Sequence, residues 1–86
     1  MGKHEKVLAK ILDGMADHNI PFRDLCNLLK FLGFRERIKG DHHIFSRERV
    51  AEILNLQPKG SRAKAYQVKQ VRELIFEYRL GEMNDE

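Results

Sequence analysis

The segment FRERIKGDHHIF, residues 34–45, is the most informative about the fold, because the spacing of apolar and polar residues changes here from a helical to a two-residue repeat. Before it, apolar residues recur every three or four positions. Within it, every second residue from Arg35 to Lys39 is basic, and a two-residue repeat is typical of a β-strand. Gly40-Asp41 is a turn signal, and residues 42–46 are then the returning strand. The sequence therefore predicts a β-hairpin.

The length of the hairpin loop determines which residues lie opposite each other. A two-residue loop pairs Lys39 with His42 and Ile38 with His43, whereas a three-residue loop pairs Ile38 with His42. The sequence leaves both registers open. In either one, strand alternation puts His42 and His43 on opposite faces, so we expect only one of them to face a substrate.

Two helices are predicted before the hairpin. The first covers residues 4–15, where an apolar stripe recurs at helical spacing, formed by Val7, Leu8, Ile11, Leu12 and Met15. The second starts at Pro21, which suits a first helical position, and runs to Leu32. Gly33 then stands where a left-handed C-terminal cap belongs, with Phe34 as its apolar partner.

A strand and a helix are predicted after the hairpin. Residues 50–56 form a short apolar run that ends before Gln57-Pro58, and this length favours a strand. Residues 58–64 form a basic loop, and a final helix runs from Tyr66 to about Leu80, where Gly81 ends it. The start of this helix lacks a good cap, because the Ala65 side chain cannot accept a hydrogen bond.

This element order predicts an α+β fold in which a small antiparallel three-stranded sheet is covered by helices, in the order α-α-β-β-β-α. We divide the chain into a helical extension at residues 1–19, one domain at residues 20–80, and an acidic tail at residues 81–86. At 86 residues a single small core is expected, so a surface site is favoured over a deep cavity.

The composition of the chain indicates the cellular location to expect and the kinds of partner that the protein can bind. The single cysteine, Cys26, excludes an intramolecular disulfide framework, and no apolar stretch approaches a membrane span or the core of a signal peptide. We therefore expect a cytoplasmic protein with no membrane partner. Between Arg35 and Arg79 eleven Lys and Arg residues stand against six Asp and Glu, which permits a polyanion partner such as RNA.

The hairpin turn combines the residues best suited to chemistry on a phosphate. Histidine exchanges protons near neutral pH, and the neighbouring Arg37 and Lys39 can hold a phosphate group. By contrast, Cys26 lies on the apolar stripe of the second helix, which indicates a buried structural thiol. With Cys26 in the core and the two histidines pointing apart, we expect no converging set of metal ligands, and no cofactor.

Two segments resemble the HicA family of toxin proteins. The first consists of LLKFLGF (residues 28–34) and RIKGDHHIF (residues 37–45). The second consists of NLQP (residues 55–58) and AKAYQVKQVR (residues 63–72), and it is similar to one branch of the family. The resemblance covers roughly residues 20–80. Asp41 stands where the family turn usually has serine, and Pro58 is followed by Lys59-Gly60 rather than by histidine.

The resemblance implies a fold like that of double-stranded-RNA-binding domains, metal-independent cleavage of mRNA, and neutralisation by a HicB-type antitoxin. The family's active histidine lies in the hairpin turn, which carries over to His42 or His43, and we favour His42 because it follows the turn directly. The expected RNA-binding residues are Arg37, Lys39, Gly40, Lys59, Arg62, Lys64 and Lys69.

The hypothesis is that one histidine acts as general base on a ribose 2′-hydroxyl or as general acid on the leaving oxygen. Two other functions remain open from the sequence. One is a non-catalytic RNA-binding module that uses the same basic surface. The other is an inactive, partner-binding protein.

Overall fold

A computed structural model describes residues 2–81 of the chain. Its elements are α1 (Lys3–Asp13), the short 3-10 helix η1 (Asp17–Asn19), α2 (Phe22–Phe31), β1 (Arg35–Lys39), β2 (His42–Arg47), β3 (Val50–Leu56) and α3 (Ala65–Tyr78). The protein is thus α+β with three antiparallel strands, and the predicted order α-α-β-β-β-α is confirmed.

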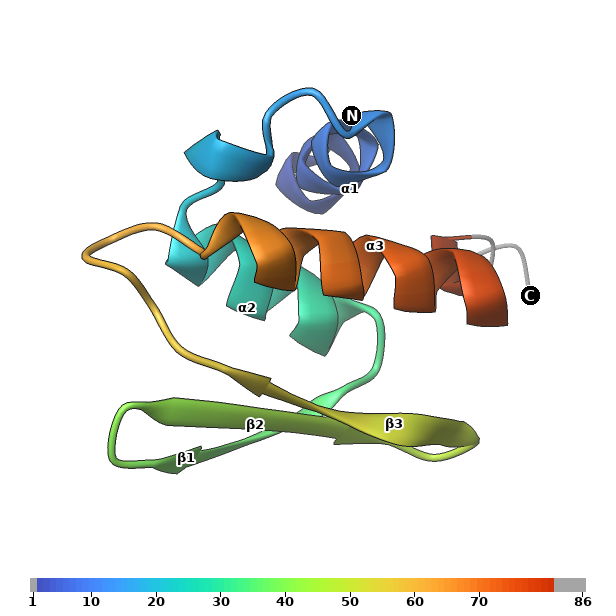
Figure 1. Cartoon of the computed structure of the whole chain (residues 1–86). Helices are drawn as coiled ribbons and strands as arrows, with labels where there is room; N and C mark the ends of the chain where they lie inside the picture. The colour runs from blue at the N-terminus through green and yellow to red at the C-terminus, as the bar shows by residue number, and fades with distance from the viewer. Residues whose placement is uncertain (1, 82–86) are drawn as a thin grey trace.

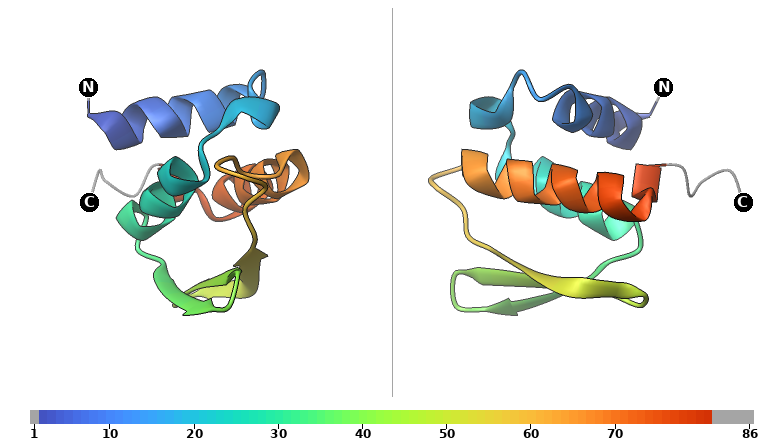
Figure 2. Two further views of the ribbon diagram at one scale, coloured as in Figure 1. Left: turned by 90° about the vertical axis from the view of Figure 1, so that its left-hand side faces the viewer. Right: turned by 45° about the vertical axis from the view of Figure 1, so that its right-hand side comes forward.

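The helices all lie on one side of the sheet. Its strand order is β1-β2-β3, α2 and α3 cover one face, and α1 lies on the far side of these two helices (Figure 1). Figure 2 shows that no helix of residues 2–81 covers the other face of the sheet, which we call the open face. On the covered face Phe45, Leu54 and Leu56 are fully buried, so the hydrophobic core lies between the sheet and the helices.

The β1–β2 hairpin has a two-residue loop, which settles the register that the sequence left open. Lys39 lies opposite His42, and Ile38 lies opposite His43. Gly40 opens the turn with φ +60°, a conformation that glycine adopts without strain, and a glycine at the first loop position is typical of a type II′ hairpin turn.

The end of α2 follows the predicted glycine cap. Gly33 has φ +96°, and the N–H groups of Gly33 and Phe34 donate to the carbonyl oxygens of Lys30 and Leu29 at 3.0 Å each. These two bonds form a Schellman motif, which satisfies carbonyls that the helix leaves unpaired. Phe34 is buried beside the cap, so the chain enters β1 from a fixed position.

The first helix is shorter than the predicted 4–15. It ends at Asp13 because Gly14 adopts a left-handed conformation with φ +78°. Met15, which we expected on the apolar stripe, is 84% exposed, and that expectation is wrong. Ile11 is fully buried and belongs to the core.

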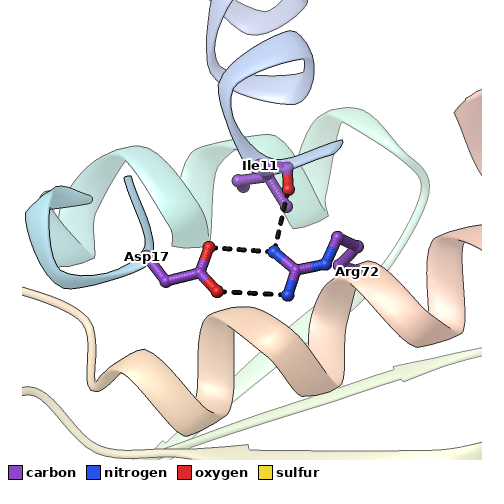
Figure 3. A network of polar contacts seen from close by, with 3 residues as sticks. All are labelled: Ile11, Asp17 and Arg72. Carbon is purple, nitrogen blue, oxygen red and sulfur yellow. Dashed lines mark hydrogen bonds and ion pairs between the residues drawn. The ribbon is translucent and has the colours of Figure 1, made fainter. Parts of the chain in front are cut away.

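Arg72 of α3 joins the N-terminal segment to the rest of the fold (Figure 3). Its Nη1 donates to Asp17 Oδ1 at 2.8 Å and to the Ile11 carbonyl at 3.1 Å, and its Nη2 donates to Asp17 Oδ2 at 3.1 Å. The guanidinium thus connects the end of α1, the η1 turn and the middle of α3.

The boundaries of α3 differ slightly from the prediction. No side chain caps its start, as the sequence indicates, because the N-cap residue is Lys64. The helix ends at Tyr78 rather than near Leu80, since Arg79 takes the left-handed position at φ +55°. Except for residue 81, the predicted acidic tail lies outside the described residues. Within residues 2–81 no helix is long and apolar enough to span a membrane.

Candidate functional site

The two histidines of the hairpin lie on opposite faces of the sheet, as strand alternation predicts. His43 shares the covered face with Phe45, whereas His42 and Ile44 belong to the open face. His42 is exposed and His43 is about one quarter exposed. The pair therefore faces two different environments, one open to a large ligand and one lined by helix α2.

The open face is basic along its β1 edge. Arg35, Arg37 and Lys39 are exposed there, on the strand positions that alternate away from the helices. Lys39 lies directly across from His42, and Arg37 lies across from Ile44. A cationic edge beside an exposed imidazole suits a phosphate chain that runs across the sheet.

His42 is held by a side chain from the neighbouring strand. Its Nδ1 lies 3.0 Å from Oδ1 of Asn55, which is the residue opposite Ile44 on β3. When Nδ1–H donates to this amide oxygen, Nε2 carries the lone pair and can accept a proton; this tautomer is assigned from the hydrogen bond. Asn55, and not the adjacent Asp41, is the partner that orients the ring.

His43 forms a short contact with a carboxylate on the covered face. Its Nδ1 lies 2.7 Å from Glu36 Oε2, and Lys30 Nζ lies 3.1 Å from Glu36 Oε1. The hydrogen bond from His43 lowers the pKa of the Glu36 carboxyl below its ordinary value, and Lys30 acts in the same direction against the cost of burial. The ring of Phe22 meets the His43 ring edge-on, with ring centroids 4.9 Å apart.

Cys26 joins this cluster, which corrects one expectation. The ligand atoms of Cys26, Glu36 and His43 all lie within 4.8 Å of one another, so the prediction that no three metal-ligating residues converge is wrong. Cys26 is only 6% exposed, and burial raises the pKa of its thiol to about 12. By itself the thiol is therefore unreactive near neutral pH, as expected for a structural cysteine.

Six of the seven predicted RNA-binding residues fall on two surfaces. Arg37 and Lys39 lie on the open face and Gly40 lies in the turn at its end. The loop cations Lys59, Arg62 and Lys64 instead line a separate hollow of about 820 Å³ beside Tyr66 and His18. Lys69 is exposed on α3 and does not line that hollow.

These two surfaces lie at the same end of the molecule. β3 leads into the basic loop from the end of the sheet that carries the 40–41 turn, because Leu56 pairs with His43 (Figure 1). Gly60 and Ser61 of that loop also border the hollow beside His43, which has a volume of about 660 Å³. The two groups of cations are therefore at one end of the molecule but on different sides of the sheet.

Sequence reasoning missed both partners of the histidines. Glu36 was detectable in part, since it alternates with the basic residues of β1 and a two-residue loop puts it on the face of His43. Asn55 was not detectable as the partner of His42, because its position depends on the β2–β3 register, which shifts between Phe45 and Arg47. No protein-family model, curated protein or solved structure matches this chain significantly.

Proposed function

We propose that this protein is a cytoplasmic, metal-independent endoribonuclease toxin of the HicA type, which cleaves mRNA on the open face of its sheet and is neutralised by a HicB-type antitoxin. One observation carries the proposal: His42 is an exposed imidazole, oriented by Asn55 and bordered by Lys39 on a basic, uncovered surface. The resemblance of residues 20–80 to that family supports the same function.

In the proposed reaction Nε2 of His42 acts as general base. It takes the proton of a ribose 2′-hydroxyl, and the freed oxygen attacks the adjacent phosphorus. The bond from phosphorus to the 5′-oxygen breaks as the new bond forms, and the leaving oxygen takes a proton from solvent or from the imidazolium. The products are a 2′,3′-cyclic phosphate and a 5′-hydroxyl, so atoms and charge balance.

Lys39 and Arg37 stabilise the negative charge that develops on the phosphate. Both are on the open face of the edge strand β1, and Lys39 is directly opposite His42. A positioned histidine contributes roughly 10²–10⁴-fold to the rate of a proton transfer. One imidazole with cationic neighbours therefore supports a slow endonuclease.

The proposed chemistry requires RNA rather than DNA, because the attacking group is the 2′-hydroxyl. The binding energy comes largely from phosphate contacts, so affinity should fall steeply with salt. Single-stranded RNA fits better than a duplex, since an unpaired strand can turn its ribose and phosphate toward the imidazole.

The test is cleavage of a labelled RNA by the purified full chain in the presence of a chelator. We expect cleavage by the wild type, products with cyclic phosphate ends, and a loss of roughly 10²-fold or more in the His42→Ala variant. An otherwise identical RNA with a single 2′-deoxyribose at the cleaved position should resist. Cleavage of that RNA contradicts the proposal, and so does a reaction that the chelator stops while circular dichroism shows the chain still folded.

A non-catalytic RNA-binding module is the alternative that the same surface favours, because Arg35, Arg37 and Lys39 can bind phosphates without any help from His42. Saturable RNA binding without cleavage, unchanged in His42→Ala, would support this alternative. An inactive partner-binding protein is the other alternative. Growth arrest on expression, relieved by a co-expressed antitoxin, argues against it.

A further inference from the structure

Three side chains with metal-binding atoms meet beneath the covered face of the sheet. They are Cys26 of α2, Glu36 of β1 and His43 of β2, and their ligand atoms all lie within 4.8 Å of one another. Each residue comes from a different element, and α2 is fixed to β1 by the Gly33 cap. The cluster is therefore assembled by the tertiary fold, and it is not a local feature of one segment.

The donor set is one that Zn²⁺ prefers. Zinc binds thiolate sulfur at about 2.3 Å and imidazole nitrogen or carboxylate oxygen at about 2.0–2.2 Å, so the ligand atoms of a tetrahedral site are roughly 3.3–3.7 Å apart. Glu36 Oε2 and His43 Nδ1 are 2.7 Å apart, and every pair in the cluster is within 4.8 Å. One observed separation is shorter than those of a zinc site and the others do not exceed 4.8 Å, so side-chain shifts of about an ångström would complete the site.

The surroundings leave room for a fourth ligand. Cys26, Glu36 and His43 all line the 660 Å³ hollow, together with Lys30 and Ser61. The hollow is open to solvent, so a water molecule can complete a tetrahedral set. The three protein ligands themselves are mostly shielded, with Cys26 6% exposed and the Glu36 side chain 13% exposed.

Lys30 competes with a metal ion for the carboxylate of Glu36. Its ammonium group lies 3.1 Å from Glu36 Oε1, so a positive charge already balances this carboxylate. The Lys30 side chain is 49% exposed and can swing into solvent. A divalent cation would then replace a singly charged group at the same carboxylate.

We propose that Cys26, Glu36 and His43 form a binding site for Zn²⁺, with water from the hollow as the fourth ligand. On binding, the thiol loses its proton to solvent and the thiolate sulfur coordinates the metal. The ion joins α2 to β1 and β2, so its role is structural. It takes no part in the cleavage proposed for the open face, because His42 points away from it.

The test is titration of the metal-free full chain with Co²⁺, which takes the place of Zn²⁺ and is visible in absorption spectra. We expect a thiolate-to-cobalt charge-transfer band that saturates at one equivalent and disappears when Zn²⁺ is added. Cys26→Ala should abolish the band, and His43→Ala should weaken binding by at least tenfold. Lys30→Met should tighten it several-fold by removing the competing charge.

His42→Ala is the matched control, because it removes the neighbouring imidazole on the opposite face and should leave the cobalt spectrum unchanged. A band that persists in Cys26→Ala, or no band at millimolar Co²⁺, overturns the proposal. If circular dichroism shows that Cys26→Ala does not fold, the cobalt affinity of Glu36→Gln replaces it as the test. An affinity equal to that of the wild type would then contradict the site. The readout is independent of RNA cleavage, so the two proposals fail separately.

Discussion

His42 and His43 are adjacent in the sequence but have different partners. The amide of Asn55 holds His42 at the open surface, whereas the carboxylate of Glu36 holds His43 beneath helix α2. His42 is exposed on the open face, whereas the His43 side chain is only about one quarter exposed, so a large substrate can reach the ring of His42. This difference is why we assign the proton transfer to His42.

Asn55 should act as a positioning residue for His42. Asn55→Ala removes the contact to Nδ1, and we expect a roughly tenfold lower cleavage rate with little change in RNA affinity, because the ring loses its fixed tautomer and orientation. Asn55→Asp should instead move the pH–rate profile toward alkaline pH, since a carboxylate stabilises the protonated ring. Identical pH–rate profiles for Asn55→Asp and the wild type would contradict this role.

Glu36 should make stability depend on pH in the acidic range. Its pKa is lowered in the folded protein, first by His43, so the stability it contributes is complete above the pKa of the unfolded chain. That contribution is lost as the pH falls through the lowered folded value. We expect the free energy of unfolding to decrease as the pH falls below the ordinary pKa of a glutamate, and the decrease to be smaller in Glu36→Gln. Urea unfolding at several pH values measures the free energy of unfolding of the wild type and of Glu36→Gln. If the two proteins show the same dependence on pH, the Glu36–His43 pair contributes nothing to it.

At the scale of elements, the Gly33 cap sets how α2 passes into β1. Gly33→Ala should destabilise the fold by about 1–2 kcal/mol for the left-handed backbone alone. A Cβ there would also lie 2.9 Å from Arg47 Nε, so the flexible Arg47 side chain would have to move, which adds a smaller cost to that value. Gly60→Ala is the control, because Gly60 also has a positive φ but no atom lies within 4 Å of the added Cβ. Equal losses in the two variants by urea unfolding would contradict the role of the close approach.

Local patterns were sufficient to predict most elements. The two-residue alternation of residues 34–39, the Gly40-Asp41 turn and the Gly33 cap each depend on neighbours in sequence, and all three are confirmed. The predictions fail where tertiary contacts or the backbone conformation of a single residue determine the structure. Met15 continues the helical repeat of α1, but the left-handed Gly14 ends the helix before it.

The candidate site was predictable only in part. Alternation separates His42 from His43, and this needs no knowledge of the register. The partners of the two rings depend on register and on the docking of α2, which no local pattern contains. For this reason Cys26 was correctly expected to be buried, but its approach to Glu36 and His43 was not foreseen.

At the scale of the whole molecule, α1 packs on the helical layer and leaves the open face of the sheet uncovered (Figure 2). Its buried Ile11 belongs to the same core as α2 and α3, and Arg72 fixes the chain that follows it. The N-terminal helix therefore stabilises the layer that supports the hairpin, although it lies far from the open face.

Arg72 should be the main polar anchor of this N-terminal segment. Arg72→Ala removes a bidentate ion pair with Asp17, and we expect a loss of about 1–3 kcal/mol, since hydrogen bonds between charged groups are among the strongest in proteins. Hydrogen exchange should show the largest loss of protection in α1. Lys69→Ala, at an exposed position of the same helix, is the control and should change little. Uniform loss of protection over all helices would contradict a local anchor.

The proposed cleavage takes place on the open face of the sheet and not on the covered face. The most direct measurement compares the single-turnover cleavage rates of His42→Ala and His43→Ala on one RNA, with a chelator present and both variants shown to be folded. We predict a loss of roughly 10²-fold or more for His42→Ala and a rate near that of the wild type for His43→Ala. Wild-type cleavage by His42→Ala, or a loss confined to His43→Ala, would contradict the claim.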